Sequence, residues 1–189
     1  VWCRPGQRDE GVSDREPAGI RRERIEAART AGPRRTARTR DMRIAEVFKQ
    51  YMEHLFAGKR CEAREMMLAA QDRGIDASKL LKTVVWAAME QIEKLYRENE
   101  ISRITEHMAV RINRMVADQL QGLLARKPKS GRRMVVFCGE GETEELGAQI
   151  VADLFEAEGW TVWFLGAGVP NDEVVQFLGK IRPDILCLY

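Results

Sequence analysis

No stretch of this chain approaches the ~18 consecutive apolar residues that a transmembrane helix requires, so we expect no membrane span. The N-terminus also lacks the apolar core of a signal peptide. The four cysteines, Cys3, Cys61, Cys138 and Cys187, include no C-x-x-C pair, and the last two lie in apolar runs. Reduced, buried thiols in a cytoplasmic protein are the simplest interpretation.

A net positive charge is found only in the N-terminal part of the sequence. Residues 1–40 hold 11 Arg against 6 acidic residues, whereas residues 41–189 hold 20 basic and 23 acidic residues. Nucleic-acid binding by the structured part is therefore disfavoured. Since large apolar side chains are almost absent before Met42, we predict that residues 1–41 form a disordered basic tail. An upstream extension of the gene and a basic arm that touches nucleic acid are the alternatives.

From Met42 onwards, apolar residues recur at the i, i+3, i+4, i+7 spacing of amphipathic helices. Gly58 and Gly74 are placed to end the first two helices, and Asp76 or Ser78 is suited to cap the third. Four helices with short connections predict an antiparallel bundle over residues 42–125. The charged segment 126–133, which contains Pro and Gly, is predicted to be a linker.

The remainder alternates short apolar runs with amphipathic segments. This alternation predicts right-handed βαβ units and a parallel sheet, so the predicted fold is a helical bundle followed by a partial flavodoxin-like α/β domain at 134–189. Two helices cover three strands poorly and the sequence stops within a strand, so we expect a missing C-terminal portion. The expected elements are strand 134–138, helix 147–159, strand 161–165, helix 172–180 and strand 185–189.

The loop after the first strand has glycines and carboxylates but no Lys or Arg. A glycine-rich loop before a helix can bind phosphate, but Glu140, Glu142, Glu144 and Glu145 would repel it, which excludes a dinucleotide or P-loop site. The acids could instead only complement the helix dipole. An acidic Mg²⁺ pocket, as in receiver domains, would need an Asp at the end of the third strand, where Tyr189 stands.

The order of bundle, linker, loop and strands resembles the cobalamin-binding module of methionine synthase, corrinoid methyl-carrier proteins and cobalamin-dependent light-sensing regulators. In these families the first loop carries D/E-x-H-x-x-G, whose His is the lower axial cobalt ligand. Residues 142–147 are similar, but Glu144 stands at the position of the His. The resemblance implies that the lower face of the corrin is contacted by Glu142, Thr143, Glu144, Glu145, Leu146, Gly147 and, after the second strand, Gly166.

The predicted bundle carries a second part of the resemblance. The helix that contains Met89 looks like the cap of corrinoid carriers. Light-sensing regulators carry in this cap a Trp followed by Glu-His, and here Tyr96 is followed ten and eleven residues later by Glu106 and His107. The resemblance implies that Met89, Tyr96, Glu106 and His107 cover the upper face of the corrin. Ordinary packing within the bundle is the alternative interpretation of Tyr96 and His107.

The function implied by the resemblance is a regulatory or sensory cobalamin-binding module, for example in transcription regulation, with adenosylcobalamin or methylcobalamin as cofactor. Glu144 is the candidate cobalt ligand, although a carboxylate oxygen binds Co(III) more weakly than imidazole does. A methyl carrier and a degenerate module for protein contacts are the alternatives. Expected partners are cobalamin and an output domain or methyltransferase. Residues 1–40 are too short and polar for a winged helix, so nucleic-acid binding through this chain is not expected.

Overall fold

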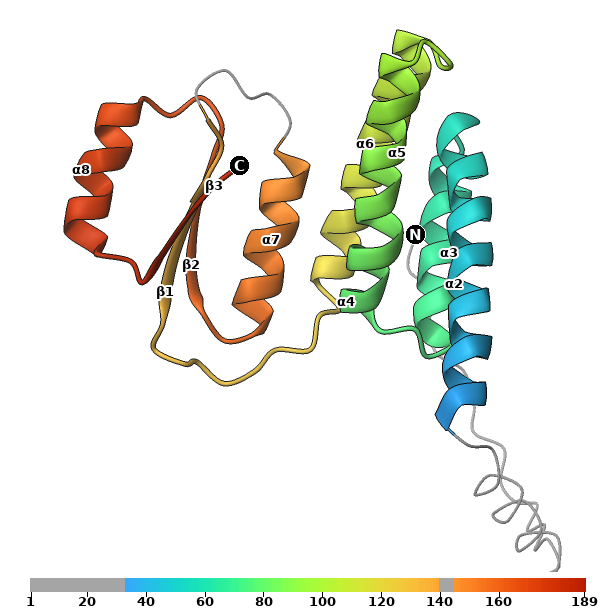
Figure 1. Ribbon diagram of the computed structural model, residues 1–189, viewed down its shortest axis with the longest axis horizontal. Coiled ribbons are helices and arrows are strands. Elements are labelled where there is room, and N and C mark those ends of the chain that lie inside the picture. Colours follow the sequence, from blue (N-terminus) through green and yellow to red (C-terminus); the bar gives the residue numbers. More distant parts are fainter. Residues whose placement is uncertain (1–32, 140–144) are drawn as a thin grey trace, which may run out of the picture. The chain divides into compact units, whose positions relative to one another are not determined.

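A computed structural model of the chain describes residues 33–139 and 145–189 (Figure 1). Residues 1–42 and residues 43–189 form two separate units. Helix α2 (Pro33–Phe56) begins at Pro33 and therefore includes residues 33–41, which we predicted to be disordered. Proline is favoured in the first turn of a helix, and the Ala and Arg residues that follow it are strong helix formers. The rest of the predicted tail, residues 1–32, lies outside the described residues.

The predicted helices of the bundle are confirmed between Arg43 and Gln121. Gly58 ends α2 with a φ of +67°, and Ser102 caps the last helix by accepting a hydrogen bond from the Thr105 backbone N–H. The predicted third helix is composite, because a π-helical segment interrupts it. The elements after α2 are α3 (Arg60–Asp72), α4 (Ala77–Leu80), the π-helical η1 (Leu81–Val85), α5 (Trp86–Arg97) and α6 (Arg103–Gln121).

The α/β region has the predicted parallel sheet. Its strand order is β2-β1-β3, which matches the first three strands of a flavodoxin-like fold. Helices α7 and α8 lie on opposite sides of this sheet (Figure 1). Cys138 is buried after β1, whereas Leu186 and Leu188 of β3 are exposed. The elements are β1 (Arg133–Phe137), α7 (Leu146–Ala157), β2 (Thr161–Gly166), α8 (Asn171–Ile181) and β3 (Ile185–Leu188).

Helix α7 packs on both the bundle and the sheet. Leu146 and Ile150 belong to the same apolar core as the bundle helices, whereas Ala148 and Ala152 pack in the core of the sheet. The predicted linker is tied to the end of this helix, because the Lys127 N–H donates to the Ala157 carbonyl at 2.7 Å. The sheet is therefore held against the bundle through α7. Within the part of the chain that the structure describes, no helix has the length and apolarity needed to cross a membrane.

Candidate functional site

The carboxyl end of the sheet meets the bundle at a cavity of about 260 Å³. Four residues that the resemblance assigned to a cofactor line it together: Met89, Tyr96, Glu106 and Leu146. They come from α5, α6 and the first residue of α7, which are far apart in the sequence. The volume lies below the ~300–1,000 Å³ of pockets for drug-sized ligands, so the cavity can hold a part of a large cofactor. The lining is completed by Ile92, Glu93, Val110, Asn113 and Tyr189.

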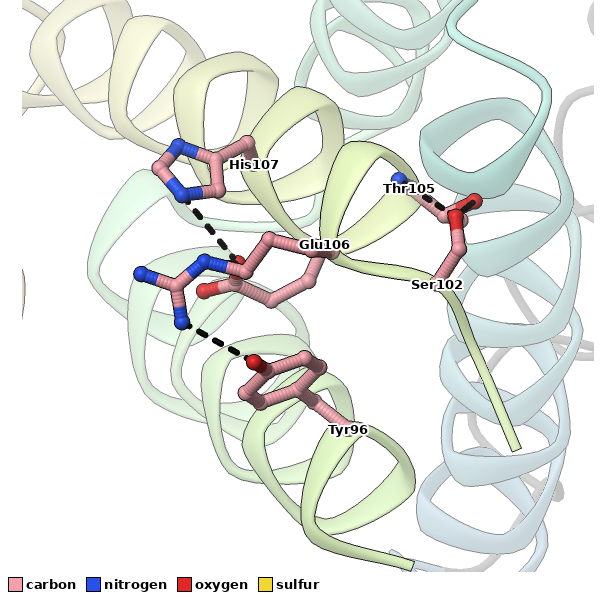
Figure 2. Close-up of polar contacts among 6 residues, drawn as sticks. Tyr96, Ser102, Thr105, Glu106 and His107 are labelled. Atoms are coloured by element: carbon pink, nitrogen blue, oxygen red, sulfur yellow. Dashed lines mark hydrogen bonds and ion pairs between the residues drawn. The ribbon is translucent and has the colours of Figure 1, made fainter. Parts of the chain in front are cut away.

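Tyr96 and Glu106, which line this cavity, belong to a cluster of polar side chains (Figure 2). The Arg103 guanidinium donates to the Tyr96 hydroxyl at 3.1 Å and lies over the Tyr96 ring. Its Nε lies 3.9 Å from Glu106 Oε2, and His107 Nε2 lies 3.7 Å from the same oxygen. Arg103 thus connects Tyr96 to Glu106. The sequence interpretation missed it, although its position one helical turn before Glu106 was a usable signal.

The Glu106 carboxylate has an unused acceptor. Its side chain is 16% exposed, and Oε2 is buried without a hydrogen-bond partner among the described residues, because the nearest nitrogens of Arg103 and His107 lie beyond hydrogen-bond distance. A buried carboxylate oxygen left without a donor costs free energy of about 1–3 kcal/mol or more. A ligand that donates a hydrogen bond from within the cavity would remove that cost. Glu106 is therefore the side chain of the cavity best prepared for a polar ligand.

His107 lies beside Glu106 but does not share its cavity. Its side chain is 54% exposed and does not line the cavity of Tyr96 and Glu106. It lines a second, more open cavity of about 650 Å³, together with Arg60, Arg111 and Arg114. One helical step separates the two side chains by ~100°, which points neighbouring residues to different faces of α6. Glu106 and His107 are thus neighbours on α6 whose side chains line two different cavities.

The lower side of the predicted site is only partly described. Glu142, Thr143 and the candidate metal ligand Glu144 lie outside the described residues. Glu145 has a carboxylate that accepts from the Ala167 N–H at 2.7 Å and lies 3.6 Å from the Arg114 guanidinium. It therefore joins the start of α7 to the loop after β2 and to α6.

The two predicted glycines are buried next to these contacts. Gly166 has a φ of +72°, and a Cβ there would meet the Glu145 carboxylate. A Cβ at Gly147 would overlap the Tyr189 phenol, so this glycine allows close packing of the last described residue against α7. No group of three or more His, Cys, Asp or Glu side chains suited to hold a metal ion occurs among residues 33–139 and 145–189.

A second polar contact joins α6 to α7, and the half-buried acid Asp153 lies near it. Gln149 donates to Asp118 at 2.6 Å. The pKa of the nearby Asp153 is raised to about 6, chiefly by burial and also by the negative charges of Glu156 and Asp118, against a lowering by Arg126. Asp153 Oδ2 is buried without a hydrogen-bond partner in the described chain. This surface between the two helices therefore contains an acid that ionises only with difficulty.

Comparison with known proteins gives this geometry a context. A protein-family model described as B12 binding domain matches residues 47–121, which span the bundle. The methanol–corrinoid protein of Methanosarcina barkeri is 26% identical over 132 residues, which are 70% of this chain and 51% of that protein. The chain thus spans about half of the length of this curated relative.

Solved structures agree with the fold. The monomethylamine corrinoid protein of Methanosarcina barkeri matches with a TM-score of 0.67 and 19% identity, over 76% of this chain and 68% of that one. The methanol:cobalamin methyltransferase complex of the same organism matches with a TM-score of 0.46 and 23% identity, over 94% and 70% of the two chains, which is too loose to show a shared fold. Residues 47–121 therefore match the B12 binding domain, and the chain has the fold of a corrinoid protein, which together support cobalamin binding.

Proposed function

We propose that this module has a regulatory or sensory role and prefers a cobalamin whose upper ligand carries hydrogen-bond donors, as adenosylcobalamin does. The observation that carries the proposal is the buried Oε2 of Glu106, which lacks a hydrogen-bond partner in the described chain and lines the same cavity as Tyr96 and Met89. A methyl group offers this oxygen nothing, whereas a ribose hydroxyl can donate to it. A hydrogen bond to a charged acceptor contributes ~1.5–3 kcal/mol.

The residues of the cavity fit an upper ligand in size and in chemistry. Met89 and Ile92 give the cavity an apolar wall, and Tyr96 gives it an aromatic one. Arg103 holds the Tyr96 hydroxyl, so the ring is oriented before a ligand arrives. Such preorganisation reduces the entropy lost on binding. In this proposal Tyr96, Arg103 and Glu106 recognise the upper ligand, and His107 acts from the neighbouring cavity.

The contacts between α6 and α7 offer a route from the cavity to the sheet. Glu106, Arg114 and Asp118 lie on α6; Arg114 contacts Glu145, the residue before α7, and Asp118 contacts Gln149 of α7. When bound, cobalamin supplies a cobalt–carbon bond that light or a reaction can break. A ligand that contacts Glu106 only while this bond is intact would favour one arrangement of α6 over another, which is the requirement for a switch.

The loop after β1 is the part of the chain proposed to meet the lower side of the corrin. Glu144 stands where the related families carry their axial His, and a carboxylate oxygen is a poorer ligand for Co(III) than imidazole. In this proposal Glu142, Thr143 and Glu144 would meet the lower side of bound cobalamin, and the Glu144 carboxylate would be a weak ligand for cobalt. The output domain or partner, a cytoplasmic location and a role in transcription regulation stay predictions.

A methyl carrier is the second candidate function. It is favoured by the name of the relative, methanol–corrinoid protein, which shares 26% identity over 132 residues. In that case the partner of this chain would be a methyltransferase, and methylcobalamin the form bound. The absence of a His at position 144 counts against this candidate. A module that has lost cobalamin and serves only in protein contacts is the third.

Binding of two cobalamins in the dark separates these functions. We would mix the chain with adenosylcobalamin or methylcobalamin, remove free ligand on a desalting column, and record the visible spectrum before and after green light. A sensor should bind the adenosyl form ~10–100-fold more tightly, because the methyl form cannot donate to Glu106. Equal affinity for the two forms, with a spectrum that green light does not change, would favour the methyl carrier. If neither form binds, the degenerate module is favoured.

Substitution of Glu106 tests the residue itself. Glu106→Leu should remove the preference for adenosylcobalamin, and Glu106→Gln, which keeps the shape and an acceptor, should retain part of it. Glu100→Gln is the matched control, because Glu100 is an exposed acid outside the cavity. A preference unchanged in Glu106→Leu would contradict the assigned role of this carboxylate.

A further inference from the structure

A buried polar pair lies beneath the cavity and takes no part in the proposed recognition of the upper ligand. The Tyr51 hydroxyl donates to Asn113 Oδ1 at 2.9 Å, and Asn113 Nδ2 donates to the Val85 carbonyl at 3.0 Å. All three residues are fully buried. Burial raises the pKa of the Tyr51 phenol, so the hydroxyl stays protonated and remains a donor. The pair links α2, α6 and the end of η1 through the interior of the bundle.

Val85 is the last residue of the π-helical segment, directly before α5 begins at Trp86. At the end of η1 the Trp86 N–H donates to the Leu81 carbonyl, which is five residues earlier, whereas in an α-helix it would donate to the carbonyl four residues earlier. Short π-helical segments are rare within α-helices and often occur at functional sites. The wider turn accommodates one residue more than an α-helix would. Since each residue of an α-helix turns by ~100°, the insertion decides which face of α5 meets α6.

The face selected by this insertion is the one that lines the cavity. Met89, Ile92, Glu93 and Tyr96 follow the i, i+3, i+4, i+7 spacing of one helical stripe, and all four line the cavity. Asn113 lines the same cavity from α6 while it holds the Val85 carbonyl. The Asn113 side chain thus contacts both the Val85 carbonyl, at the end of the π-helical segment, and the cavity that α5 lines.

We propose that the Tyr51–Asn113 pair fixes the register of α5 at the π-to-α junction, and that both residues thereby act as positioning residues for the upper ligand of cobalamin. This inference rests on the proposed function for its ligand, but the fixed register belongs to the chain itself. An amide side chain suits this role because it can accept from Tyr51 and donate to Val85 at once. A leucine could fill the same space but could make neither hydrogen bond.

The double variant Tyr51→Phe/Asn113→Leu tests the inference with little harm to the fold. Removing both partners of the Tyr51–Asn113 hydrogen bond leaves neither side chain unsatisfied, whereas either single change does, and the Val85 carbonyl loses only its side-chain donor. Val116→Ala is the matched control, because Val116 lies one turn further along α6, is buried in the same core and does not line the cavity. Thermal melting of all three proteins establishes that they are folded.

Two measurements on the folded variants decide the outcome. The first is amide hydrogen exchange of α5 without ligand, which should rise about fivefold or more in the double variant and stay unchanged in Val116→Ala. The second is the affinity for adenosylcobalamin together with the circular dichroism of the bound corrin. We expect about tenfold weaker binding and an altered spectrum in the double variant, because Met89 and Tyr96 would no longer face the ligand.

The failure of this inference is distinguishable from failure of the proposed function. If the wild-type chain takes up no cobalamin, the proposed function is wrong, and hydrogen exchange alone then judges whether the pair fixes the register of α5. If the double variant exchanges like the wild type, or binds adenosylcobalamin with the same affinity and spectrum, the pair has no positioning role. If Val116→Ala shows the same changes as the double variant, the effect is loss of stability and the inference is overturned.

Discussion

Asp153 on α7 should make the stability of this protein depend on pH in an unusual direction. Burial, together with the nearby charges of Glu156 and Asp118, raises its pKa from 3.8 to about 6, and one of its carboxylate oxygens has no hydrogen-bond partner in the described chain. Because the folded-state pKa lies above the unfolded one, the folded state binds the proton more tightly. The stabilisation is fully present below pH ~4 and is lost as the pH rises through ~6.

The magnitude follows from the size of the shift. About two pKa units correspond to an upper limit of ~3 kcal/mol, since one unit is 1.36 kcal/mol. Asp153 is only half-buried, so solvent screening should reduce this to ~1–1.5 kcal/mol. Asp153→Asn removes the charge and adds an N–H group that can donate to Asp118 or Glu156. At pH 7.5 it should therefore raise the melting temperature by ~3–5 °C for a chain of this size.

Thermal unfolding followed by circular dichroism between pH 4 and pH 8 measures this effect. The difference between Asp153→Asn and wild type should be near zero at pH 4 and should grow up to pH ~7. Glu65→Gln is the control, because Glu65 is an exposed acid on α3. A difference that does not change with pH, or a variant that is less stable than wild type at pH 7.5, would refute the argument that an ionised Asp153 destabilises the fold.

Substitutions at three further positions have defined outcomes. Gly159→Ala should cost more than ~1 kcal/mol in urea unfolding, because Gly159 has a φ of +90° and a Cβ would overlap the Pro128 carbonyl. Asp76→Ala should cost ~1 kcal/mol in the same assay, since Asp76 accepts from the Ser78 N–H at 2.8 Å as the helix cap, and Asp76→Asn should retain most of this stability. Glu144→His should tighten cobalamin binding and shift the visible spectrum to a His-ligated form, and an unchanged spectrum would argue against a position of Glu144 beneath cobalt.

The elements themselves were predictable because their causes are local. The apolar spacing of α3, α5 and α6 marks the buried faces of these helices, and Asp76, Gly58 and Gly74 mark where helices begin or end. Short apolar runs separated by helical segments predict a parallel sheet for topological reasons. Both kinds of pattern act over a few residues, and a sequence displays them directly. The start of α2 was missed because helix formers in a charged segment carry no apolar periodicity.

The sequence by itself thus determined the order of the elements, the sheet topology and the likeness to cobalamin-binding modules. Only the tertiary structure decided which side chains share a cavity: it joined Met89, Tyr96 and Glu106 to Leu146, placed His107 in the next cavity, and engaged Glu145 in contacts with α6 and the loop after β2. The physical reason is that the direction of a side chain depends on helix register and packing. One π-helical turn rotates every later residue about the helix axis, and no local pattern in the sequence predicts that turn.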